Sequence, residues 1–236
     1  MFAGTSVAWL LQSTGMPRRS LNRAGGIVFH VLNRSARRGR LFFEPEDYLQ
    51  FESILGVALR KFHIRLLAYC VMPNHWHLVV WPEGEDLPRF MHWLTLIHAR
   101  QWHDTKGSRG QGHVYQDRYR AIPVQCDTHL LTLIRYVERN PLRAGLVERA
   151  QNWPWGSAWR HRNSHHNVPL SEWPIPRPSD WLDLINETSA GDAVTEIRAA
   201  IEDDRPLGEA NWSALTARTV GLSLRKRGRP RLIEPG

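Results

Sequence analysis

The sequence predicts an α+β fold of the ferredoxin-like sandwich type, in which an antiparallel sheet carries helices on one or both faces. Three observations support this prediction. A β-branched and aromatic run comes first, a pair of apolar runs joined by a tight turn follows later, and segments with helical periodicity separate and follow them. The resulting order is strand, helix, strand pair, helix, strand, helix, which is typical of this sandwich. The order alone predicts no function.

The first half of the fold is predicted from local patterns. The run GGIVFHVLN at residues 25–33 follows a Gly-Gly breaker and is expected to form a strand. Apolar residues then recur at helical spacing from about Pro45 to Phe62, which predicts a helix. Leu66 to Trp81 contains two apolar runs that meet at Met72-Pro73-Asn74, so this stretch is expected to form two strands and a tight turn.

The second half is predicted in the same way. A helix is expected from about Pro88 to His103, and a short strand over Tyr119–Val124. Pro123 cannot donate to a sheet ladder, so this strand is placed at an edge. Asp127 is a suitable N-cap for a third helix that ends before Pro141.

Composition limits the class of protein. The chain has 236 residues of which 42% are hydrophobic, enough for one sizeable core, and no run approaches the ~18 apolar residues that a membrane helix needs. Residues 1–16 lack the features of a signal peptide and are expected to form a disordered leader. The two cysteines, Cys70 and Cys126, form no disulfide or zinc pattern, which favours a cytoplasmic location.

Positive charge indicates a polyanionic partner. The formal net charge is +8, and the arginines are concentrated near the two ends of the chain. Seven arginines and no acid lie between residues 16 and 40, and five arginines with Lys226 lie between residues 218 and 231. A solvated basic surface is the simpler interpretation of any such run, but two basic ends around a neutral centre favour nucleic acid.

Two pairs of residues are candidates for chemistry. His75 and His77 alternate with Trp76 along a strand, so their imidazoles share one face and can chelate a metal, although such a pair is often a chance arrangement. Tyr136 and Asn140 are four residues apart on the third predicted helix and share a face of it. A helix face with a phenol and an amide oxygen, laid over two histidines, would suit phosphoryl transfer.

Three linked motifs carry a resemblance to a known family. MPNHWHLVV at residues 72–80, YQDRYRAIPV at 115–124, and YVERNPLRAGLV at 136–147 followed by WPWGSA at 153–158 resemble the single-tyrosine (Y1) HUH transposases, and within them the REP-associated tyrosine transposases. The resemblance covers roughly residues 17–162. It implies the HUH endonuclease fold, with Trp76 as the bulky hydrophobic residue between the two histidines.

The resemblance also implies an activity and a set of site residues. Tyr136 would be the nucleophile, and His75, His77 and Asn140 would hold a divalent ion, Mg²⁺ or Mn²⁺. The reaction would be transesterification on single-stranded DNA beside a palindromic hairpin, through a 5′-phosphotyrosine. Relatives imply a monomer more than a homodimer, with no membrane partner and no small-molecule cofactor. The arginines expected to contact the DNA are Arg18, Arg19, Arg23, Arg34, Arg37, Arg38, Arg40, Arg118, Arg227, Arg229 and Arg231.

The chain changes character after residue 162. The sequence therefore predicts a leader at 1–16, a transposase domain at 17–162 and a C-terminal extension at 163–236. The extension is proline-rich, then has two segments that can form short helices, and ends in LRKRGRPRL. A Gly-Arg-Pro core flanked by arginines resembles an AT-hook that binds an A·T minor groove, and a basic tail is the equally simple interpretation.

Two other functions stay open on the sequence. The chain could be a hairpin-DNA-binding regulator that has lost strand transfer, although its four candidate site residues argue against this. It could also be a hydrolytic nuclease with a metal and water as nucleophile, in which Tyr136 is structural. A covalent adduct between protein and DNA distinguishes the transesterase from both.

Overall fold

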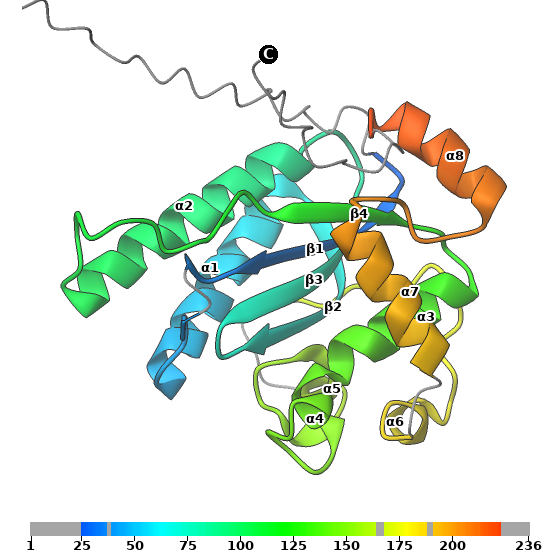
Figure 1. Ribbon diagram of the computed structural model, residues 1–236. Coiled ribbons are helices and arrows are strands. Elements are labelled where there is room, and N and C mark those ends of the chain that lie inside the picture. Colours follow the sequence, from blue (N-terminus) through cyan, green and yellow to red (C-terminus); the bar gives the residue numbers. More distant parts are fainter. Residues whose placement is uncertain (1–24, 37–38, 164–167, 188–190, 223–236) are drawn as a thin grey trace, which may run out of the picture.

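The computed structural model describes residues 25–36, 39–163, 168–187 and 191–222 (Figure 1). The predicted leader and the AT-hook-like tail lie outside the described residues. So do eight of the arginines expected to contact DNA, which are Arg18, Arg19, Arg23, Arg37, Arg38, Arg227, Arg229 and Arg231.

A four-stranded antiparallel sheet forms the centre of the fold. Its strands are β1 (Val28–Arg34), β2 (Ile64–Met72), β3 (His75–Pro82) and β4 (Arg120–Val124). Their order across the sheet is β2-β3-β1-β4, and each neighbouring pair is antiparallel. β3 thus lies between β1 and β2, so the connection from β1 to β2 passes over it, as in the split βαβ unit. The predicted ferredoxin-like fold class is confirmed.

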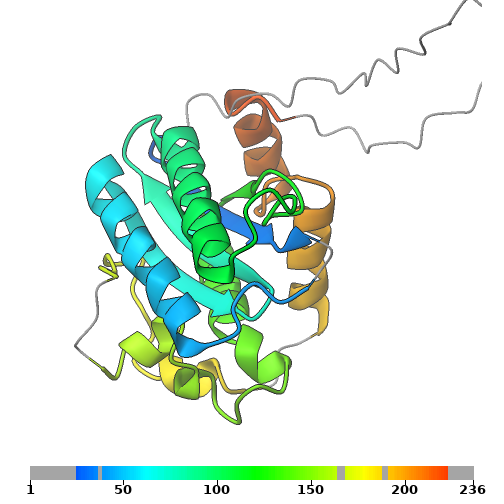
Figure 2. The same ribbon diagram turned by 90° about the vertical axis from the view of Figure 1, so that its left-hand side faces the viewer.

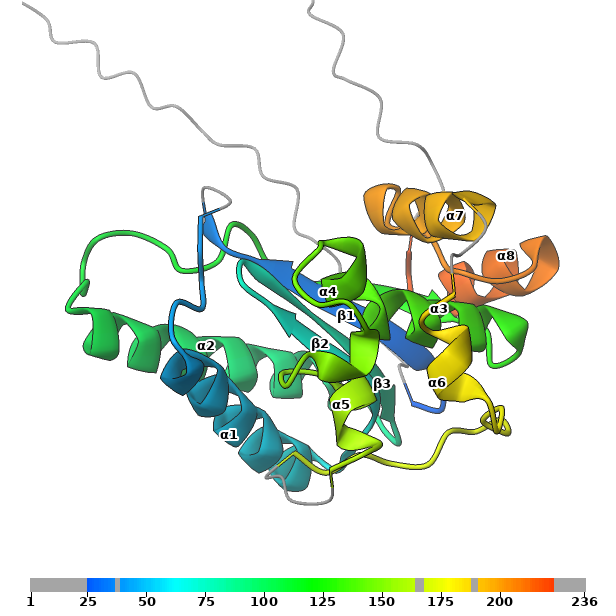
Figure 3. The ribbon, with the colours of Figure 1, turned by 90° about the horizontal axis from the view of Figure 1, so that it is seen from below.

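Helices cover both faces of this sheet. α1 (Pro45–Phe62) and α2 (Leu87–Lys106) pack side by side on one face, as Figure 2 shows. α3 (Thr128–Glu138) lies on the other face, so that the sheet is the middle layer when seen from below (Figure 3). Two apolar cores result. Phe51 and Trp76 belong to the core under α1 and α2, and Val79 and Leu133 belong to the core under α3.

Local sequence explains where α1, α2 and α3 begin and end. α1 has the predicted bounds: Pro45 occupies its first turn, and His63 ends it in the left-handed conformation. α2 is longer than predicted at both ends, because Leu87 already packs into the core and Gly107, at φ 59°, provides the C-cap. Asp127 caps α3 as predicted, since its carboxylate accepts a hydrogen bond from the backbone N–H of His129.

Later segments of the chain cover both outer edges of the sheet. On the β2 side, Gly156 forms a bridge with Cys70, and a Cβ at Gly156 would meet the carbonyl oxygen of Tyr69 at 3.3 Å. On the β4 side, Leu207 exchanges backbone hydrogen bonds with Pro123 and Gln125. β4 is therefore the outer strand that its proline predicted, and its exposed edge is protected by the C-terminal part of the chain.

The described residues after 162 pack against the rest of the molecule. The Trp173 indole N–H donates to the carbonyl of Leu67 at 2.9 Å, and the helix at residues 191–202 contacts α3 and β4. The boundary predicted at residue 162 stays a prediction. The elements described after α3 are α4 (Asn140–Arg143), η2 (Ala150–Asn152), α5 (Ser157–Arg160), α6 (Trp181–Leu184), α7 (Gly191–Glu202) and α8 (Ala210–Thr219).

The two segments expected to form short helices near the end of the chain are α7 and α8. Within the described ranges, none of the helices combines the length and the hydrophobicity needed to cross a bilayer.

Candidate active site

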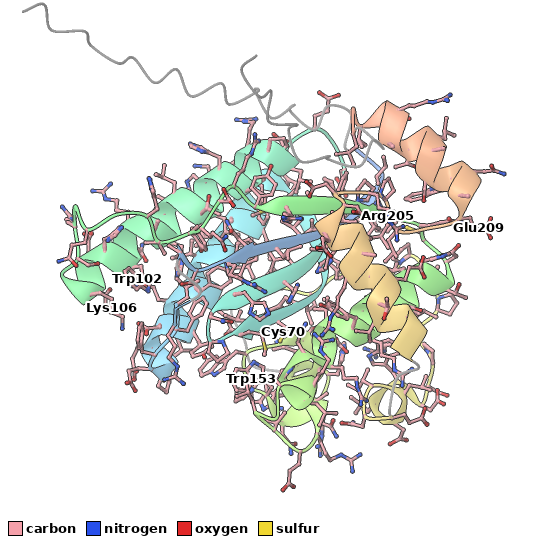
Figure 4. The ribbon with its side chains drawn as sticks, viewed as in Figure 1. Cys70, Trp102, Lys106, Trp153, Arg205 and Glu209 are labelled. Atoms are coloured by element: carbon pink, nitrogen blue, oxygen red, sulfur yellow. The ribbon has the colours of Figure 1, made fainter. Side chains whose placement is uncertain are left out.

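Strand β3 places two histidines on the sheet face that α3 covers. His77 is 3% exposed and lies one residue from Trp76, which points into the opposite core. The rings of His75 and His77 lie 4.9 Å apart between centroids. Cys70, the cross-strand partner of His77, is labelled in Figure 4 and locates this part of the sheet close to the end of α3. The shared face predicted from the alternation is confirmed.

A third histidine, His30 of β1, lies against His77. The two side chains form a buried hydrogen bond of 2.9 Å between His30 Nε2 and His77 Nδ1. Burial lowers the pKa of His30 to about 3. Burial also holds the pKa of His77 well below its ordinary value, with smaller contributions from His75, His30 and two arginines. Both rings are therefore neutral near pH 7, and their hydrogen bond leaves Nε2 of His77 on the open side.

His75 is oriented by the turn that precedes it. Its Nδ1 lies 2.6 Å from the Oδ1 of Asn74, and because an amide oxygen can only accept, the Nδ1 carries the proton. Its Nε2 then presents a lone pair. Burial, with smaller contributions from the positive charges of Arg34 and Arg143, lowers the pKa of His75 to about 4. The imidazole thus remains neutral and able to bind a metal at neutral pH.

Helix α3 brings the predicted nucleophile to these histidines. Leu130, Leu133 and Val137 are fully buried against the sheet, which fixes the side of the helix on which Tyr136 lies. The Tyr136 ring is edge-on to His77, with 5.9 Å between ring centroids, and its side chain is largely buried. The structure therefore brings together the tyrosine and the histidine pair that the sequence predicted separately.

Asn140 follows the tyrosine in a different local structure from the one predicted. α3 ends at Glu138, and Asn140 begins the one-turn helix α4, because Pro141 cannot continue the hydrogen-bond ladder of α3. Arg139 between them keeps a near-helical conformation, φ −83° and ψ −4°. Asn140 consequently stays on the Tyr136 side, where its Nδ2 donates to the Tyr136 carbonyl at 3.4 Å.

The donor set fits a divalent ion. The Nε2 atoms of His75 and His77 make no hydrogen bond to a described residue, and both rings are neutral. Two such nitrogens and an amide oxygen suit a hard or borderline cation that keeps open coordination positions. Among the residues that the structure describes, no group of three or more His, Cys, Asp or Glu side chains is arranged to hold a metal. The Oδ1 of Asn140, whose side chain lies on the Tyr136 side, is the candidate for the third ligand.

Sequence reasoning missed two residues of this site. His30 stands in a run of apolar residues on β1, and a polar residue at an inward strand position was the signal that could have identified it. Arg143 lies in the NPLR segment, where it was not distinguished from the other arginines. Its guanidinium lies 4.3 Å from the centroid of the Tyr136 ring.

Three of the arginines expected to contact DNA are described, and all are exposed. Arg34 is the cross-strand partner of His75 at the end of β1 and is therefore beside the site. Arg40 immediately precedes the buried core residue Leu41, and the guanidinium of Arg118 lies over the ring of Tyr119, 5.4 Å from its centroid.

Four tryptophans make structural contacts within the fold. The indole N–H groups of Trp102 and Trp153 donate to backbone carbonyls of Leu41 and Val71, and Trp155 stacks on Tyr48 at 4.8 Å. Trp93 packs against the core under α1 and α2.

Comparison with known proteins shows which family the chain resembles. Residues 24–140 match the family described as "Transposase IS200 like". The chain is 24% identical over 176 residues to the REP-associated tyrosine transposase of Escherichia coli strain K12, covering 72% of this chain and 93% of that protein. It is 23% identical over 166 residues to a relative from Haemophilus influenzae named "Putative REP-associated tyrosine transposase", covering 66% of this chain and 91% of the relative.

Two solved structures match at lower sequence identity. A REP-associated tyrosine transposase bound to a REP hairpin matches 67% of this chain and 92% of its own, with 20% identity and a TM-score of 0.48. A structure described as a putative transposase from Deinococcus radiodurans R1 matches 59% of this chain and 97% of its own, with 18% identity and a TM-score of 0.37.

Residues 24–140, just under half of the chain, thus match the IS200-like transposases, and the relatives are named as transposases, which are enzymes that cleave and rejoin DNA. The two relatives that it matches over about two thirds of its length are named as REP-associated tyrosine transposases, one of them as putative.

Proposed function

We propose that this chain cleaves and rejoins single-stranded DNA beside hairpin repeats through a 5′-phosphotyrosine on Tyr136, with Mg²⁺ or Mn²⁺ held by His75, His77 and Asn140. The observation that carries the proposal is the approach of the Tyr136 ring to His77, 5.9 Å between centroids, from elements far apart in the sequence. A phenol beside two neutral imidazoles and an amide oxygen is the set that this reaction needs.

The nucleophile is Tyr136. Its Oη attacks the scissile phosphorus, the new Tyr–O–P bond replaces the P–O3′ bond, and the DNA 3′-oxygen leaves. The phenol loses its proton and the departing 3′-oxygen gains one, so charge and protons balance. One phosphodiester is exchanged for another, and the 3′-hydroxyl can therefore reverse the step without a nucleotide cofactor.

The other residues prepare the site for this step. When bound, a divalent ion supplies Lewis-acid stabilisation to the charge that develops on the scissile phosphate. His75 and His77 stay neutral at pH 7 because burial is the largest cause lowering both pKa values. His30 holds the ring of His77 in place, and the Asn74 side chain does the same for His75.

The DNA is expected to lie along the exposed arginines near the site. Of the arginines expected to contact DNA, Arg34 lies at the end of β1 and Arg118 lies in the segment that leads to β4. Guanidinium groups bind phosphate oxygens without reading the base sequence, so hairpin selection needs other contacts. The relatives' names support repeats of the REP type as the substrate. We propose action as a monomer in the cytoplasm, with residues 163–236 as an extension that positions DNA.

A covalent-adduct assay tests the proposal. The protein is mixed with Mn²⁺ and labelled single-stranded hairpin DNA taken from repeats that flank its own gene, then run on a denaturing gel. We expect an adduct with the natural chain and none with Tyr136→Phe. The matched control is Tyr119→Phe, because Tyr119 packs on the core of the opposite sheet face and its substitution should leave the adduct unchanged.

The other outcomes identify the alternatives. Cleavage without an adduct, retained in Tyr136→Phe, would indicate a hydrolytic nuclease that uses water. Tight binding of the hairpin without cleavage would indicate a regulator. Either result overturns the proposal.

A further inference from the structure

Arg143 contacts both the nucleophile and the expected third metal ligand. Its Nη2 donates to the Oδ1 of Asn140 at 2.6 Å, and its guanidinium lies 4.3 Å from the Tyr136 ring centroid. The region matched by the transposase family ends at Asn140, three residues before this arginine. Arg143 is seven residues after Tyr136, so the near-helical path through α4 puts both on one side.

The contact with Asn140 involves the atom that a metal would need. The Nδ2 of Asn140 is directed to the Tyr136 carbonyl, so the Oδ1 is the side-chain atom that faces Arg143. A guanidinium and a divalent cation repel each other when they share one oxygen, and a charged hydrogen bond draws electron density away from that oxygen. In this arrangement, Arg143 therefore competes with a metal for the Oδ1 of Asn140.

The side chain is also free to move. Arg143 is exposed, so its guanidinium can turn without opening the core. Its planar group of N–H donors matches the oxygens of a phosphate diester. The scissile phosphate must reach Tyr136, and the Arg143 guanidinium already lies over that ring.

The two neighbouring arginines on the same helical segment are engaged elsewhere. Arg139 donates to the backbone carbonyls of Ile185 and Glu187, and Arg135 donates to the carbonyl of Glu187 at 3.0 Å. These contacts hold the segment after α6 against α3. Arg143 instead contacts Asn140 and the Tyr136 ring. The three arginines therefore do not share one role.

We propose that Arg143 is a positioning residue that couples metal binding to DNA binding. In the free protein its guanidinium withholds the Oδ1 of Asn140 from the metal and covers Tyr136. The scissile phosphate of single-stranded DNA draws the guanidinium away, which releases Asn140 as a ligand and uncovers the tyrosine. The metal and the DNA then bind with positive cooperativity. This inference rests on the proposed function.

The test measures Mn²⁺ affinity of the full chain without DNA, by electron paramagnetic resonance of free Mn²⁺. Arg143→Met removes the guanidinium and keeps a good helix former at an exposed site. We expect this variant to bind Mn²⁺ about 5-fold or more tightly than the natural chain, in the range usual for coupled sites. Arg139→Met is the matched control, because it removes the same charge four residues earlier, and we expect a smaller change.

A second arm adds the hairpin single strand with Tyr136→Phe as background, so that no cleavage occurs. The DNA should tighten Mn²⁺ binding when Arg143 is present and have less effect when it is methionine. The inference is overturned if Arg143→Met binds Mn²⁺ no more tightly than the natural chain, or if Arg139→Met gives the same gain. The adduct assay is independent of this comparison, so failure of the proposed function is distinguished from failure of this inference.

Discussion

Replacing His30 by leucine tests how far the site depends on the residue behind the metal ligand. His30 is 1% exposed, and its Nε2 lies 2.9 Å from the Nδ1 of His77. Leucine fills a similar volume but has no acceptor. His77 then either buries an unpaired Nδ1–H or moves its proton to Nε2, which removes the lone pair that would bind the metal.

The size of the effect follows from this hydrogen bond. An unsatisfied buried donor costs about 1–3 kcal/mol of folding free energy, which for a chain of this size lowers Tm by roughly 2–12 °C. Loss of a partner behind a metal-binding histidine typically weakens metal affinity ~10–100-fold. We therefore expect His30→Leu to be less stable and to bind Mn²⁺ more weakly, measured by thermal unfolding and by Mn²⁺ titration.

The matched variant is His30→Gln, whose side-chain amide can reach the position of Nε2 and accept from His77. It should recover most of the Mn²⁺ affinity while the leucine variant does not. If His30→Leu binds Mn²⁺ with the affinity of the natural chain, His30 does not orient His77 and the reasoning is refuted.

Two further predictions concern polar groups away from the reaction. Trp181→Phe removes the indole N–H that donates to the buried carboxylate of Glu138 at 2.8 Å, and we expect a loss of about 1.5–3 kcal/mol in chemical unfolding; an unchanged free energy of unfolding would show that α6 does not stabilise α3. Burial lowers the pKa of His98 to about 3, whereas in the unfolded chain this imidazole titrates near 6.5. Between these two pH values the unfolded state binds one more proton than the folded state, so stability falls as the pH drops from 6.5 toward 3. His98→Gln should reduce that dependence by up to about 1.4 kcal/mol per pH unit, measured by denaturant unfolding at pH 5 and pH 8; an equal dependence in both proteins would contradict the assignment.

Local patterns predicted the elements and half of the site because backbone geometry acts over a few residues. The alternation along β3 put His75 and His77 on one face, and the capping residue Asp127 placed the start of α3. Pro123 predicted an outer strand, which β4 is. Each of these inferences needs only the residue types within one turn or one strand.

The same local reasoning failed where one residue changes the path of the chain. Tyr136 and Asn140 were expected on one helix, but Pro141 ends the α3 ladder and starts α4. α2 extends three residues beyond its predicted end at His103, because the helix continues until Gly107 provides its C-cap.

Contacts between distant elements were decided by strand order and register. β1 lies beside β3, so His30 meets His77, and no spacing in the sequence encodes that neighbour. The fold of the segment after α3 determines that Arg143 lies over Tyr136 while Arg139 does not. The sequence by itself determined the strands, the helices, the paired histidines and the chemistry to expect of them. Only the tertiary structure decided which side chains lie behind the histidines and over the tyrosine, because those contacts arise when the sheet closes and packs against α3.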